Sequence, residues 1–100
     1  MGDKKYKEAI KAFTKSLQNN KFNFDALFYR GVSNLDSGLP LRAITDFNEL
    51  IDTCSDYRKT IFIVLSIAYR RTNDYTGALR TLSKSIVKYP NYIEAYIARG

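Results

Sequence analysis

The residues from Phe62 to Pro90, FIVLSIAYRRTNDYTGALRTLSKSIVKYP, carry the strongest structural signal in the sequence. Their apolar residues recur three and four positions apart, which is the spacing of one face of an α-helix. The polar segment 72–74 (TND) interrupts this pattern and Pro90 ends it, as turn residues and proline do between helices. These residues therefore predict two helices joined by a short turn.

The same two-helix pattern returns along the chain at intervals of 34 or 35 residues. An alanine followed four positions later by a bulky apolar residue occurs three times, at Ala9 and Phe13, Ala43 and Phe47, and Ala78 and Leu82. A small residue recurs in the same way, as Gly31, Ser66 and Gly100. Helices are therefore expected over residues 4–19, 24–37, 40–54, 57–72 and 75–88, and a sixth near Asn91, a good N-cap residue.

This pattern resembles the tetratricopeptide repeat (TPR), a helix–turn–helix unit of 34 residues. The best match to its motif is Phe62, Leu65, Ser66, Tyr69, Ala78, Leu82 and Pro90; a second match is Leu27, Arg30, Gly31, Asn34, Ala43 and Phe47. The resemblance implies an all-α, right-handed TPR α-solenoid of antiparallel helix pairs, with five or six helices. It predicts the second helix of a partial repeat at 2–23, repeats at 24–57 and 58–91, and the start of another at 92–100, as in a fragment of a longer array.

The composition argues against catalysis. The chain has 100 residues, no histidine and a single cysteine, Cys54, so it cannot form a Ser-His-Asp triad, a Cys-His pair, an internal disulfide or a four-cysteine zinc site. The sequence also lacks a glycine-rich phosphate-binding loop. We therefore expect no enzyme activity, no cofactor and no metal.

Neither a membrane segment nor a secretion signal is visible. The longest apolar run, Ile61–Leu65, is far shorter than the roughly 18 residues that a transmembrane helix needs. The first residues lack the apolar core of a signal peptide. We expect no membrane contact and an intracellular, cytoplasmic location, where a lone cysteine stays reduced.

The resemblance also implies where a partner would bind. In TPR arrays the first helix of each pair lines a concave groove that holds an extended peptide or a partner helix. By position the groove residues here are Asp25, Phe28, Tyr29, Val32, Asp36, Ile63, Val64, Ile67, Arg70, Arg71 and Ile97. Most are apolar, which favours contact with a protein, although Ile63 and Val64 could equally pack between helices. Arg70 and Arg71 would suit an acidic partner.

One TPR subtype binds the acidic C-terminal tails of chaperones through a clamp of lysine, asparagine and arginine. The matching positions here hold Phe28, Val32, Val64, Glu94 and Ala98. None of these side chains is the required donor, and Glu94 would repel a carboxylate. We therefore do not expect this chain to bind chaperone tails.

The net charge of +6 leaves two alternatives to a protein or peptide ligand. Residues 25–57 carry six acidic and two basic side chains, whereas the segments on both sides are basic. A nucleic-acid-binding repeat is one alternative, because basic residues and tyrosines are interleaved; we do not favour it, since the lysines fit solvated helix faces. Homotypic assembly is the other, through exposed apolar faces of the end helices.

Overall fold

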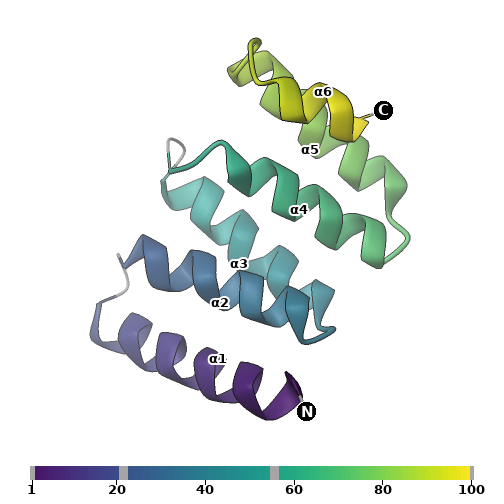
Figure 1. Ribbon diagram of the computed structural model, residues 1–100. Helices are drawn as coiled ribbons and strands as arrows, with labels where there is room; N and C mark the ends of the chain where they lie inside the picture. The colour runs from purple at the N-terminus through teal and green to yellow at the C-terminus, as the bar shows by residue number, and fades with distance from the viewer. Residues whose placement is uncertain (1, 21–22, 55–56, 100) are drawn as a thin grey trace.

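All regular secondary structure is α-helix in the residues that the computed structural model describes, which are 2–20, 23–54 and 57–99. Its elements are α1 (Gly2–Asn19), α2 (Phe24–Asp36), α3 (Pro40–Thr53), α4 (Thr60–Arg71), α5 (Tyr75–Lys88) and α6 (Ile93–Arg99). Successive helices run antiparallel and stack in one direction, so that the two ends of the chain lie at opposite ends of the stack (Figure 1). The predicted all-α fold of antiparallel helix pairs is confirmed.

Two predicted helix starts are wrong, and both fall where one pair connects to the next. Helix α4 begins at Thr60 instead of residue 57, because the bonds before it span three residues, as in a turn: the N–H of Ile61 donates to the carbonyl of Arg58 at 3.2 Å. Helix α6 begins at Ile93, and Asn91 does not cap it. The N–H of Tyr92 donates to the carbonyl of Tyr89 at 3.0 Å, so Pro90 and Asn91 form the centre of a turn.

The turns inside the pairs are repeat-equivalent and close in the same way. Gly38 and Asn73, 35 residues apart, both have a positive φ, of 86° and 63°. The next residue in each case donates its N–H back to the preceding helix, Leu39 to the carbonyl of Asn34 at 2.8 Å and Asp74 to that of Tyr69 at 2.9 Å. This left-handed closure is a common helix ending, and it sets the tight antiparallel packing within each pair.

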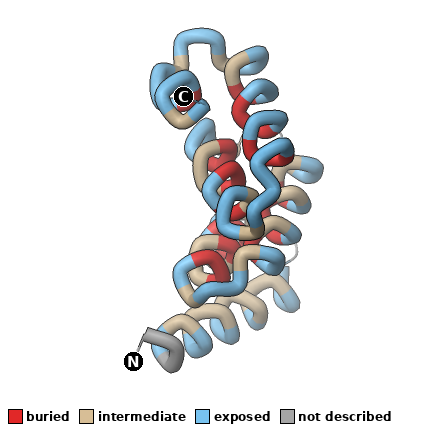
Figure 2. Tube along the Cα trace, turned by 90° about the vertical axis from the view of Figure 1, so that its right-hand side faces the viewer, coloured by how far each residue is buried: buried red, intermediate tan, exposed pale blue. Residues whose placement is uncertain are grey.

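The core lies where neighbouring helices meet, and it explains the recurring alanines and bulky residues. Ala43, Phe47 and Leu82 are fully buried. A methyl group added at Gly31 would lie only 2.6 Å from Cε1 of Phe47, so the absence of a side chain allows α2 to pack on that ring. In Figure 2 the buried residues follow the interior of the stack. Gly100, the third member of the small-residue series, lies outside the described residues.

The stack has an inner and an outer side. The backbones of α2 and α4, and those of α4 and α6, approach within 8 Å, whereas within the described ranges those of α1 and α3, and of α3 and α5, do not. Helices α2, α4 and α6 therefore line the inner, concave side, and α1, α3 and α5 form the outer side. No helix in the described part of the chain has both the length and the apolarity to pass through a bilayer.

Candidate functional site

The candidate site is the inner face, by which we mean the side chains of α2, α4 and α6 that the sequence predicts to line the groove. Three large apolar residues are exposed there, one on each helix: Tyr29 (42 %), Ile67 (37 %) and Ile97 (73 %). Val32, Ile63 and Val64, on the first two of these helices, are half-buried. The charged residues Asp25, Asp36, Arg70 and Arg71 are exposed. The structure thus places a discontinuous apolar surface on three consecutive inner helices.

Phe28 is not part of this surface. It is only 7 % exposed and belongs to the core. Its ring centroid lies 6.0 Å from that of Phe47 on α3 and 5.5 Å from that of Tyr57 in the connection that follows α3. The expectation that Phe28 faces a partner is therefore wrong, because the rings of Phe47 and Tyr57 pack against it and bury it.

Asp25 is already engaged within the chain. The hydroxyl of Tyr57 donates to its carboxylate, and the Arg58 guanidinium lies 3.5 Å from the same oxygen. Burial, reinforced by the hydrogen bond to Asp25, raises the pKa of Tyr57. Both charged side chains are largely exposed, so the ion pair itself contributes little to stability. These contacts join Tyr57 and Arg58, which precede α4, to the first turn of α2.

Arg70 and Arg71 join the inner helices to one another. Arg71 extends from α4 to α2 and donates to the carbonyl of Leu35 at 2.9 Å. Arg70 extends in the other direction and donates to the carbonyl of Ala98 in α6 at 2.5 Å. Each carbonyl belongs to the last turn of its helix, where a cation also interacts favourably with the helix dipole. The sequence led us to expect that these arginines contact an acidic partner, and their role in joining neighbouring helices was not predicted.

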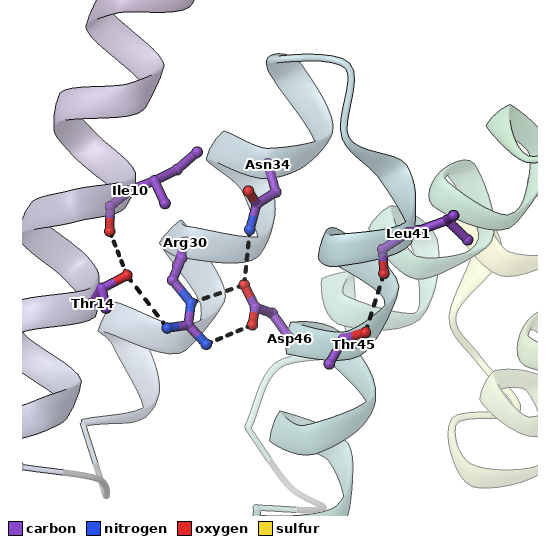
Figure 3. Close-up of polar contacts among 7 residues, drawn as sticks. All are labelled: Ile10, Thr14, Arg30, Asn34, Leu41, Thr45 and Asp46. Carbon is purple, nitrogen blue, oxygen red and sulfur yellow. Dashed lines mark hydrogen bonds and ion pairs between the residues drawn. The ribbon is translucent and has the colours of Figure 1, made fainter.

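A polar network that sequence reasoning missed connects α1, α2 and α3 on the outer side (Figure 3). Arg30 donates to both carboxylate oxygens of Asp46, at 2.7 and 3.0 Å, and to the hydroxyl of Thr14 at 3.4 Å. Asn34 donates its amide N–H to Asp46 at 3.1 Å. The visible signal was the pair of departures from the repeat motif, in which Arg30 stands at a leucine position and Asn34 at an aromatic one.

The arrangement offers surfaces for binding. Within the described ranges, no three histidine, cysteine, aspartate or glutamate side chains converge to hold a metal ion. The polar groups that do meet, such as Arg30 and Asp46, neutralise each other. The inner face instead combines exposed apolar side chains with charged residues at its edges, which is the character of a surface that contacts another protein.

Comparison with known proteins agrees with this geometry. A tetratricopeptide repeat model matches residues 65–92. The fold is similar to the crystal structure of MamA, a TPR protein, with a TM-score of 0.84, 25 % sequence identity and 99 % of this chain covered. The chain spans 60 % of the MamA chain that it matches. A search of curated protein sequences gave no significant match. The chain is thus a helical repeat protein that contains a tetratricopeptide repeat and has a TPR-like fold throughout its described residues.

Proposed function

We propose that this chain is a non-catalytic scaffold or adaptor that binds an extended peptide or a helix of a partner protein on its inner face. The observation that carries this proposal is the exposure of Tyr29, Ile67 and Ile97 on three successive inner helices. TPR domains generally bind proteins, and the proposal places the site on this face, in a protein of the cytoplasm. Chaperone tails are not the proposed ligand, since Val32 and Val64 stand where the clamp needs polar donors.

Selection of peptides from a random display library tests this proposal. Peptides selected on the unmodified chain are expected to lose at least tenfold in affinity for Ile67→Glu, because the new carboxylate interrupts the apolar surface at its middle helix. The matched control is Leu79→Glu, at an exposed leucine of the outer helix α5, which should change affinity less than twofold. Equal weakening by the two variants, with both still helical by circular dichroism, would refute binding at the inner face.

Nucleic acid is not the proposed ligand. On the inner face the two adjacent cations, Arg70 and Arg71, donate to backbone carbonyls of α6 and α2. Phosphate binding by these guanidinium groups would have to compete with the contacts that join the helices.

Homotypic assembly is a second candidate. It is favoured by residues at the two ends of the stack that are exposed, although the residues at the same repeat positions inside the stack are buried. Tyr96 on α6 is 41 % exposed, whereas its repeat equivalent Phe62 is buried, with its ring 6.3 Å from that of Tyr89, the residue that follows α5. Ala12 on α1 is exposed, whereas its equivalent Asp46 is buried against α2. Helix α6, the first helix of a repeat, thus exposes the face that would pack on the second helix of that repeat. Helix α1, the second helix of a repeat, exposes the face that would pack on a first helix. In this candidate, α6 of one copy packs on α1 of the next, a head-to-tail contact.

A mixing experiment tests this second candidate. The unmodified chain should gain mass with concentration in light scattering, because head-to-tail contacts propagate, while Ala12→Lys and Tyr96→Lys should each remain monomeric. An equimolar mixture of the two variants should form a one-to-one dimer, since one intact α6 face meets one intact α1 face. Val87→Lys, at an exposed position of α5, is the control and should behave as the unmodified chain. A mixture that stays monomeric would exclude the head-to-tail contact.

A further inference from the structure

Three cavities lie in a row on the outer side, between α1 and α3 and above α2. Their volumes are about 310, 280 and 230 Å³. The first two share Ile10 and Arg42 as lining residues, and the last two share Thr14 and Arg30. We call this continuous depression the outer groove. It follows α1 from Lys7 to Gln18, a length of about 16 Å at 1.5 Å per helical residue.

The middle cavity of the outer groove is open where α2 has one short side chain, Asn34. In the second repeat the equivalent residue is Tyr69, whose hydroxyl accepts a hydrogen bond from Asn48 of α3 at 3.2 Å. The ring of Tyr69 also lies against α5, since a methyl group added at Gly77 would be 2.9 Å from its Cδ1. Tyr69 therefore fills the space between α3 and α5. Asn34 ends short of the corresponding space between α1 and α3, and leaves it open.

One end of the outer groove is positively charged. Lys7 and Lys11 of α1 and Arg42 of α3 line the first cavity, and all three are exposed. None of them forms an ion pair or hydrogen bond with another side chain in the described part of the chain. The one carboxylate in the middle cavity, Asp46, is neutralised by Arg30, and Glu49 lines only the far cavity, at the other end of the groove. An anionic group would therefore be attracted to this end.

The floor and the walls suit a peptide better than a nucleic acid. None of the residues that line the three cavities is aromatic, so the outer groove has no platform on which bases could stack. Its walls alternate apolar groups, such as Ile10 and Leu17, with hydroxyl groups, such as Thr14. On the floor, the buried Oδ1 of Asn34 has no donor among the described residues, and Figure 3 shows it turned away from Asp46.

We propose that the outer groove is a second binding site, for a short acidic peptide in extended conformation. A length of about 16 Å holds about five extended residues at 3.3 Å each. The peptide carboxylates lie at Lys7, Lys11 and Arg42, and its backbone follows the polar floor towards Gln18. This site is independent of the inner face, because the two surfaces lie on opposite sides of the stack.

Fluorescence anisotropy with a labelled five-residue peptide, which has two glutamates at one end followed by three alanines, tests the proposal. The double variant Lys11→Glu/Arg42→Glu should bind at least tenfold more weakly than the unmodified chain. The control Arg80→Glu/Lys84→Glu changes the net charge by the same amount on exposed positions of α5, and should bind within twofold. Equal loss in both variants would show attraction by net charge alone and overturn the site.

Two further measurements test whether binding depends on the shape of the groove and whether the groove prefers a peptide to other anions. Asn34→Tyr copies the second repeat and should abolish binding without a change in net charge; unchanged affinity would overturn the assignment to the outer groove. A five-nucleotide adenylate strand or inorganic phosphate should displace the peptide at least tenfold less effectively than unlabelled peptide. Competition as strong as that of the peptide would overturn the ligand class. Circular dichroism checks that each variant keeps its helical content.

Discussion

Phe47→Ala is expected to lower the free energy of unfolding by about 3–5 kcal/mol. Phe47 is fully buried on α3; its ring lies 6.0 Å from that of Phe28, and it fits against the bare backbone of Gly31. Truncation removes apolar contacts with α2 and leaves a void that this close packing cannot easily close. For a chain of this size the loss is a large share of a total stability of about 5–15 kcal/mol.

Urea denaturation followed by circular dichroism measures this effect. The control is Leu41→Ala on the same helix, where the leucine is exposed and the expected change is within about 0.5 kcal/mol. A similar loss in the two variants would contradict the assignment of Phe47 to the centre of the core.

Asp46→Ala is expected to cost about 3 kcal/mol. The carboxylate is buried and accepts two hydrogen bonds from Arg30 and one from Asn34. Without it, a mostly buried guanidinium loses its counter-ion and Asn34 loses its acceptor. The loss is larger than that of an exposed ion pair because water cannot fully replace these partners.

The second repeat supplies the compensating variant. At the positions equivalent to Arg30 and Asp46 it has Leu65 and Thr81, both buried. Arg30→Leu/Asp46→Thr removes both charges together and should recover most of the stability that Asp46→Ala loses. Urea denaturation of the single and double variants decides this point. A double variant that is less stable than Asp46→Ala would mean that the network stabilises the fold by more than the pairing of its two charges.

The helices could be predicted from the sequence because their signals are local and repeated. The apolar spacing, the recurring alanines and the turn at Gly38 each determine structure within a few residues. The wrong starts at residue 57 and Asn91 lie between repeats. There a backbone turn replaces the first helical turn, and it shows only in the hydrogen bonds from Ile61 to Arg58 and from Tyr92 to Tyr89.

The candidate site was less predictable because it depends on contacts between distant segments. Periodicity places Phe28 on the same helix face as exposed residues, and it cannot show that Tyr57 covers the ring. It also gives no sign that Arg71 reaches the carbonyl of Leu35, 36 residues away. Arg30 and Asn34 were visible as departures from the motif. Their role could not be predicted, because it depends on contact with Asp46 of the next helix.

The most direct test of the inner face as the binding surface is an NMR titration of the isotopically labelled chain with a peptide selected on it. Binding at the inner face predicts that the largest chemical-shift changes fall on α2, α4 and α6, at Tyr29, Ile67 and Ile97 and their neighbours. The same peptide should leave the amide signals of Leu79 and Val87, on the outer helix α5, almost unchanged. Largest shifts on α3 and α5, with Ile67 and Ile97 unaffected, would contradict the proposal.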